Sequence, residues 1–117
     1  MSAYTRLFLA MVPLVLALEL PLYAALAPAG RRLRALLGAT LGNAVSYPLL
    51  WFVWVRVLGH DAAIFAGEAS AVVLEGLSLV ICGLGARRAF AVALVVNLYS
   101  WAVGEWMFRA ILPRLAP

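Results

Sequence analysis

Four apolar runs of about 20 residues make up most of this chain, and they constrain its fold more than any other feature. A helix needs about 20 apolar residues to cross the hydrocarbon core of a bilayer. The four runs cover residues 7–27, 35–57, 62–84 and 89–111. The joints between them are short enough to make consecutive helices antiparallel. The sequence therefore predicts an all-α protein, a four-helix transmembrane bundle that forms a single domain over residues 1–117.

The amino-acid composition is that of a membrane protein. Hydrophobic residues make up 67% of the chain and charged residues 12%, whereas a soluble domain is about half apolar and about a quarter charged. The lipid bilayer is therefore the first partner that we expect. All nine basic residues are arginines, and together with the abundance of Ala, Leu and Val this favours a GC-rich bacterial genome. We expect a multi-pass protein of the bacterial cytoplasmic (inner) membrane.

The arginines lie at the ends of the apolar runs, which indicates a role in topology and in contacts with lipid headgroups. The sequence shows no solvated basic face, so we expect no nucleic-acid partner. The joints at 27–34 and 85–88 carry five arginines and no acidic residue. The other side carries Arg6, Arg56, Asp61, Arg109 and Arg114. The positive-inside rule then predicts that these two joints are cytoplasmic and that both termini lie outside.

One order of polar residues occurs twice along the chain. A glutamate is followed 12 residues later by two arginines, and then by an Asn-x-x-Ser motif. The copies are Glu19, Arg31 with Arg32, and Asn43 to Ser46, then Glu75, Arg87 with Arg88, and Asn97 to Ser100. Residues 7–57 and 62–111 are thus predicted to be two tandem helical-hairpin repeats. Since each repeat has two spans, both insert in parallel orientation, related by an axis along the membrane normal.

The rise per residue of a helix predicts that the amide and carboxyl side chains of both copies lie at the same depth in the membrane. Glu19 lies about 18 Å, and Asn43 about 16–17 Å, from the first arginine joint. We therefore expect Glu19, Asn43, Glu75 and Asn97 to form a polar layer near the bilayer middle. A charged side chain there costs about 2.5–3.5 kcal/mol, which favours an orientation toward the bundle interior. The layer is either a proton or cation site or a hydrogen-bonded clamp that holds the helices together.

A second set of polar residues accompanies the layer: Ser46, Glu68, Ser100 and Glu105. Asp61, Glu68 and Glu75 would form a ladder of carboxylates from one surface, which suits proton or cation access. Alternatively, Glu68 and Glu105 face lipid headgroups. One histidine, His60, and one cysteine, Cys82, are too few for a zinc site. We expect no metal and no cofactor.

Aromatic and small residues add two further expectations. Trp51, Trp54, Trp101 and Trp106 lie in the second halves of the second and fourth spans. They indicate an interfacial anchoring belt or, alternatively, an aromatic-lined pocket near Glu68 and Ser46. Gly38, Gly42 and Ser46 form a small-xxx-small stripe that allows close helix approach. Pro21 and Pro48 should each free a backbone carbonyl one turn earlier, at Ala17 and Ala44.

Four short motifs, "ELP" at 19–21, "NAVSYPLLW" at 43–51, "EASAVVLE" at 68–75 and "NLYS" at 97–100, carry a resemblance. Together they resemble small four-span bacterial integral membrane proteins without an assigned function. In those proteins the second motif reads Asn-x-x-Thr-His-Pro, followed by Trp. Tyr47 stands at the histidine position here, which argues against a histidine-dependent metal or acid–base role. The resemblance implies the four-span fold over nearly the whole chain and brings no activity.

Three functions are compatible with these features of the sequence. The first is transport, with proton or cation handling by Glu19 and Glu75. The second is an accessory or assembly subunit of a larger membrane complex, whose polar layer serves packing. The third is an intramembrane enzyme that acts on a lipid-linked substrate, although no catalytic motif such as GxSxG or HExxH is present and we assign no catalytic residue. Four spans are few for a lone transporter, which favours a homodimer or a larger complex.

Overall fold

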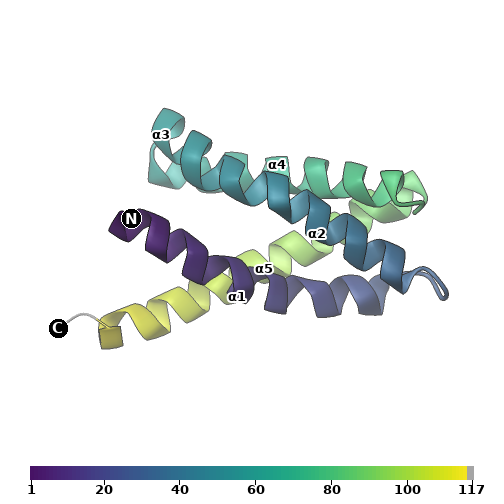
Figure 1. Cartoon of the computed structure of the whole chain (residues 1–117), viewed down its shortest axis with the longest axis horizontal. Coiled ribbons are helices and arrows are strands. Elements are labelled where there is room, and N and C mark those ends of the chain that lie inside the picture. The colour runs from purple at the N-terminus through teal and green to yellow at the C-terminus, as the bar shows by residue number, and fades with distance from the viewer. Residues whose placement is uncertain (116–117) are drawn as a thin grey trace.

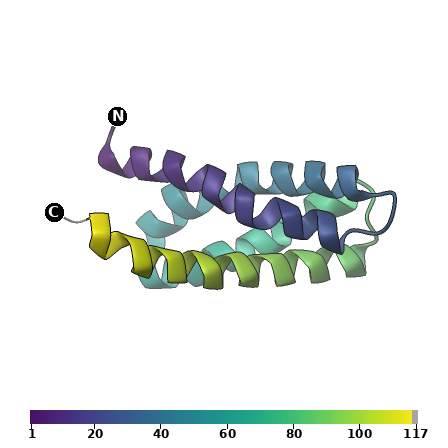
Figure 2. The same cartoon turned by 90° about the horizontal axis from the view of Figure 1, so that it is seen from below.

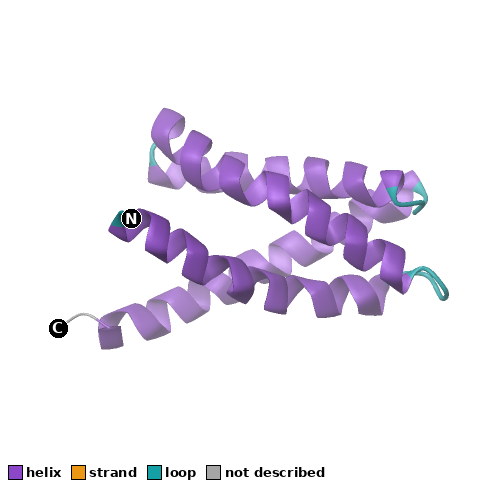
Figure 3. Ribbon diagram, in the orientation of Figure 1, coloured by secondary structure: helices purple, strands orange, loops and turns teal. Residues whose placement is uncertain are grey.

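In the computed structural model of this protein, every long segment is a helix (Figure 3). The structure describes residues 1–115, and among their side chains it leaves out those of Phe108 and of residues 111–115. The side chain of Arg114, one of the arginines expected on the side of the termini, therefore lies outside the described part. Within this part, helices account for nearly the whole chain.

Four long helices follow one another in alternating directions and are connected by short joints (Figure 1). The first is α1 (Ala3–Leu26). The second is continuous and consists of α2 (Arg32–Leu49), the π-helical segment η1 (Leu50–Trp54) and α3 (Val55–Leu58). The third and fourth are α4 (His60–Ile81) and α5 (Ala86–Leu115). All four are long and apolar enough to cross a membrane. The prediction of an all-α, multi-pass membrane protein is thus confirmed.

Local sequence explains where the helices begin and end. The Oγ of Ser2 accepts the Thr5 N–H at 3.1 Å and caps α1. Because of this cap, α1 begins at Ala3, before the start of the expected span. Each joint contains a glycine with a positive φ, a conformation in which a Cβ would be strained. These glycines are Gly30 and Gly59 at +77° and Gly83 at +101°.

The second spanning helix contains an irregular turn that the sequence analysis did not predict. Pro48 lacks a backbone N–H, so the normal hydrogen bond to the Ala44 carbonyl is missing. Directly after Leu49 the helix widens into η1, and π-helical turns frequently occur at functional sites. The wider turn brings both Leu50 and Trp51 to the wall of the cavity described below.

The helices form a ring in which each one packs against two neighbours: α1 lies between α2 and α5, and α4 closes the ring opposite α1. The two arginine-bearing joints lie at one end, and both termini lie at the other (Figure 2). The buried apolar core occupies the half near the arginine joints. It consists of Tyr23, Ala27, Ala35, Ala39, Leu79, Leu84, Ala89, Val92, Ala93 and Val96. Its many alanines let the helix backbones approach closely.

The small-residue stripe on α2 faces α4. A Cβ placed on Gly42 would lie 2.7 Å from the Cα of Glu75, and one on Gly38 would lie 3.1 Å from the Cα of Leu79. The lack of a side chain at these two glycines therefore allows the short distance between the two helices. Four exposed residues of α2 are large and apolar, as expected for a surface that faces lipid: Leu33, Leu37, Leu41 and Val45.

Candidate functional site

Asn43 links the two buried glutamates directly. Its Nδ2 donates to Oε2 of Glu19 at 2.8 Å and to Oε1 of Glu75. The same nitrogen also lies 3.1 Å from the carbonyl oxygen of Ala39, one turn earlier on α2. Glu19 is 2% exposed and Glu75 is fully buried. Side chains of α1, α2 and α4 thus meet at one nitrogen atom.

The fourth helix completes the set of donors. Asn97 Nδ2 donates to Oε2 of Glu75 and, at 2.8 Å, to the carbonyl oxygen of Ala93. The hydroxyl of Ser100 donates to Oε1 of Glu19 at 2.6 Å. Each of the four carboxylate oxygens therefore accepts a hydrogen bond from a side chain of another helix. The structure brings together the four residues expected in the polar layer, and it adds Ser100 to them.

Backbone packing explains why the layer forms at this height. Gly42 precedes Asn43, and its missing side chain lets α2 approach the backbone of Glu75. Both asparagines bond back to the carbonyl four residues earlier, and this bond orients their amide groups. A helix with a larger residue at position 42 would hold the Asn43 amide farther from α4.

Tyr23 lies on the arginine side of the layer, and sequence reasoning did not single it out. It follows Glu19 by one helical turn, so it shares the same face of α1. Its side chain is fully buried, and its hydroxyl makes no hydrogen bond with any residue that the structure describes. The spacing of four residues from Glu19 is the signal that was available. Tyr23 belongs to the apolar core and lies between Glu19 and the arginine joint that follows α1.

A cavity of about 300 Å³ lies on the other side of the layer. All four spanning helices line it, and it extends from the layer to His60 and Glu105 near the α3–α4 joint. The layer and neighbouring hydroxyl residues that line it are Glu19, Asn43, Ser46, Asn97 and Ser100. The hydrophobic remainder of the wall includes Leu7, Met11 and Ile64.

The cavity changes the expected order of the carboxylates. Asp61 is exposed and is not among the described lining residues, whereas Glu68 lines the cavity. Glu75 is fully buried, bonded to Asn43 and Asn97, and Glu19 is the carboxylate of the layer that lines the cavity. The ladder Asp61, Glu68, Glu75 therefore has to be revised to Glu68, Glu19, Glu75.

Glu68 and Glu105 differ in their surroundings. Glu105 forms an ion pair with Arg109 at 2.8 Å, in which the Arg109 side chain is 78% exposed and the Glu105 side chain is 41% exposed. Such an exposed pair contributes little to stability. Glu68 is half-buried and makes no hydrogen bond or ion pair with a described residue. It is thus an unpartnered carboxylate in the cavity wall, within the span of α4.

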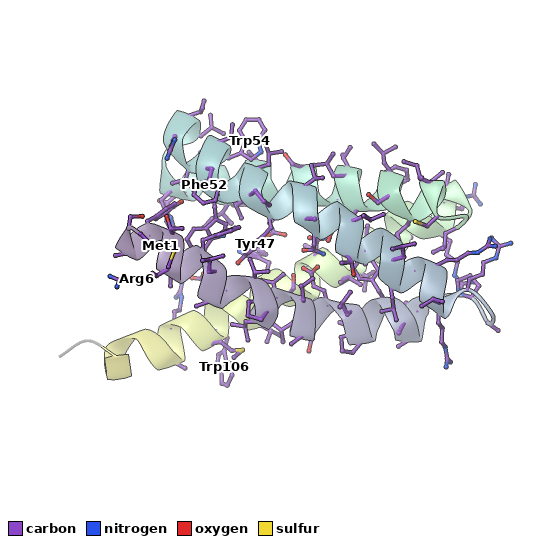
Figure 4. All side chains as sticks on the ribbon, in the orientation of Figure 1. Met1, Arg6, Tyr47, Phe52, Trp54 and Trp106 are labelled. Atoms are coloured by element: carbon purple, nitrogen blue, oxygen red, sulfur yellow. The ribbon has the colours of Figure 1, made fainter. Side chains whose placement is uncertain are left out.

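The aromatic residues are divided between the cavity and the outer surface. Tyr4, Tyr47, Trp51 and Trp101 line the cavity. The Tyr4 hydroxyl donates to the Trp51 carbonyl at 2.5 Å, and Phe8 stacks on Tyr47 with 5.6 Å between ring centroids. These contacts join α1 to the second spanning helix, and Tyr47 lies between them in Figure 4. Trp106, by contrast, is 69% exposed and points outward from α5 (Figure 4).

Among the residues that the structure describes, no three His, Cys, Asp or Glu side chains gather in a way that could hold a metal ion. Comparison of this chain with protein-family models, with curated proteins and with solved structures found no match. The polar layer and the cavity are therefore the features of the molecule that bear on its function.

Proposed function

We propose that this protein is a transport unit of the bacterial cytoplasmic membrane that handles protons or cations at Glu19 and Glu75. The observation that carries the proposal is the cavity, which is lined by all four spanning helices and reaches the buried carboxylate of Glu19. Intramembrane carboxylates beside a cavity are the usual components of proton and cation pathways. The surrounding lipid bilayer is the partner that the exposed apolar surface requires.

The energetics favour a functional role over a purely structural one. Two glutamates in the middle of spanning helices cost at least about 5 kcal/mol on insertion scales. Hydrogen bonds between membrane helices average about 0.6 kcal/mol each. The four bonds that Glu19 and Glu75 accept therefore recover only about half of that cost. A clamp alone does not explain why both acids are present.

The arrangement of donors suggests a route for a proton. Glu68 lies about 10 Å from Glu75 along α4, on the side of the cavity. From the cavity a proton reaches Glu19 first. The Asn43 amide donates to both acids, so it holds Glu19 and Glu75 together and does not itself carry the proton. Beyond the layer, Tyr23 and the apolar core block the path toward the arginine joints. Release on that side requires movement around Tyr23.

The internal repeat belongs to the same proposal. Each predicted repeat contains its own Glu–Asn bond, between Glu19 and Asn43 and between Glu75 and Asn97. Both asparagines also bond to the carbonyl four residues earlier. These equivalent contacts support two tandem hairpins in parallel orientation. The arginines of the two joints favour a cytoplasmic location for that end. A second copy of the chain, or a larger complex, would complete a transport unit of ordinary size.

Proton movement in liposomes tests this function. We expect the purified protein to acidify the lumen when a membrane potential, or a gradient of Na⁺, K⁺ or an ammonium ion, is imposed. Glu75→Gln should reduce the initial rate by about tenfold or more, because the amide binds no proton while keeping the shape of the side chain. Asp61→Asn, at an exposed acid outside the layer, is the matched control and should keep the wild-type rate.

Gel filtration of each variant in detergent establishes that the bundle has assembled. An unchanged rate in Glu75→Gln would remove the layer from the transport pathway. Proton movement no faster than in empty liposomes, under every gradient, would refute transport as a whole. In that case, co-purification of a stable larger complex would favour the accessory-subunit interpretation.

A further inference from the structure

The wall of the cavity contains one acid without a partner. Both carboxylate oxygens of Glu19 already accept hydrogen bonds, from Asn43 and Ser100. Glu105 is paired with Arg109. Glu68 alone of the three glutamates in the wall makes no bond to a described residue. A carboxylate in this position, half-buried inside a membrane span, favours a bound positive charge.

Aromatic rings form much of the remaining wall. Trp51 and Tyr47 come from the second spanning helix, and Trp101 comes from α5. The faces of such rings attract cations, most strongly in a site from which water is excluded. No arginine is among the described residues that line the cavity. The lining therefore favours a positive charge over a negative one.

The size and apolar character of the cavity suit an organic ligand better than a bare metal ion. A volume of about 300 Å³ lies at the small end of the range for organic ligands. Leucine, methionine and isoleucine side chains line the cavity beside the aromatic rings, and such surface suits a hydrocarbon group. The described residues also hold no cluster of ligands for a metal.

We propose that this cavity binds a small amphipathic organic cation, whose ammonium group contacts Glu68 and whose apolar part lies against Tyr47, Trp51 and Trp101. The proposal deepens the function proposed above, on which it rests, by giving the chemical class of the substrate. The cation bound at Glu68 and the proton bound at Glu19 would then share one cavity. A transporter that exchanges a cation for a proton requires such an arrangement.

Binding measured apart from transport tests the proposal. The probe is benzyltrimethylammonium, titrated by calorimetry into the protein in phosphatidylcholine nanodiscs. Neopentylbenzene, in which carbon replaces the nitrogen, has the same shape without the charge. We expect saturable binding of the cation and none of the neutral compound. Binding of both with equal affinity would overturn the proposal, because the cavity would then select only for apolar shape.

Two matched pairs of variants locate the site. Glu68→Gln should weaken binding by about tenfold or more, whereas Asp61→Asn, outside the cavity, should leave it within about twofold of wild type. Trp101→Leu should weaken binding by about threefold or more, whereas Trp106→Leu, on the outer face of α5, should not. Wild-type affinity in Glu68→Gln would overturn the proposal.

The two proposals fail in different ways. Absence of benzyltrimethylammonium binding, together with proton movement that depends on Glu75, would overturn the substrate class and leave transport standing. Saturable binding that depends on Glu68, without proton movement under any gradient, would support the substrate class and refute transport.

Discussion

Asn43 is the residue on which the interior of this protein depends most. It bonds to Glu19 and Glu75, so it connects three of the four spanning helices. Asn97 and Ser100 contact one carboxylate each. Loss of Asn43 would leave one oxygen of each glutamate without a side-chain donor, and a buried acceptor without a donor is costly.

Asn43→Ala should lower the free energy of unfolding by about 1–3 kcal/mol. The reason is that two buried carboxylate oxygens lose their hydrogen-bond donor, whereas the free-energy cost of burying the two acids in the membrane remains. Reversible unfolding in mixed detergent micelles measures this change. Thr40→Ala is the control: Thr40 is exposed, and its hydroxyl bonds only to the Leu36 carbonyl, so a change within about 0.5 kcal/mol is expected.

The double variant with Asn43→Ala and Glu75→Gln provides a stricter check. If the bond to Asn43 supports Glu75, the two changes together should cost less than their sum. Strictly additive effects would show that the two side chains do not cooperate in the native protein.

At the residue scale, the sequence predicted the depth of the polar layer but not its orientation. The fixed rise of a helix relates position to height, so Glu19, Asn43, Glu75 and Asn97 could be placed together. Which acid lines the cavity depends on how each helix is rotated about its own axis. Four helices of low amphipathicity do not reveal this, because lipid and core side chains are both apolar. Thus the ladder was predicted to begin at Asp61 and to pass from Glu68 directly to Glu75 without Glu19, and Tyr23 was missed.

At the scale of elements, the contact of α2 with α4 is set by two glycines. The spacing of Gly38, Gly42 and Ser46 predicted a close helix approach, because only helix geometry is needed for that inference, but it did not identify α4 as the partner. The π-helical turn after Pro48 was not predicted. A proline removes one hydrogen bond, but the sequence does not say whether the helix kinks or widens in response.

Gly42→Ala should destabilise the bundle by about 1–3 kcal/mol, through overpacking. The new Cβ would lie 2.7 Å from the Cα of Glu75, a backbone atom that cannot move without its helix. Thermal unfolding in detergent measures the effect. Gly104→Ala is the control, because nothing lies within 4 Å of its Cβ position in α5. That change should be neutral or stabilising by up to about 1 kcal/mol, since alanine favours helix.

Equal stabilities of the Gly42→Ala and Gly104→Ala variants would contradict a tight α2–α4 contact. A decrease in proton movement in Gly42→Ala, measured at a temperature where the variant is folded, would further connect the interhelical distance to the polar layer.

At the scale of the whole molecule, one end is closed and the other contains a cavity. The apolar core fills the end near the arginine joints, whereas the cavity extends toward the α3–α4 joint. The four-span, all-α architecture was predicted from the lengths of the apolar runs and is confirmed. The internal repeat and the bacterial inner membrane stay predictions, because neither helix length nor hydropathy reports on them.

The orientation of the molecule has a direct test in Cys82, the single cysteine of the chain. It is partly exposed and follows the last residue of α4, close to the joint that carries Arg87 and Arg88. A membrane-impermeant maleimide should label it only after cells expressing the protein are permeabilised, because that joint is predicted to be cytoplasmic. His60→Cys in a Cys82→Ser background should be labelled in intact cells. The reverse pattern would invert the topology.

The geometry at Asn43 has a consequence for communication between the two acids. Its amide nitrogen carries two hydrogens but lies within bonding distance of three oxygens, from Glu19, Glu75 and Ala39. Two hydrogens are therefore shared among three acceptors, and protonation of either glutamate would leave more of this donor capacity for the other two oxygens. A change in protonation at Glu19, which lines the cavity, would thereby alter the hydrogen bonding of Glu75, which does not line it, through the amide of Asn43.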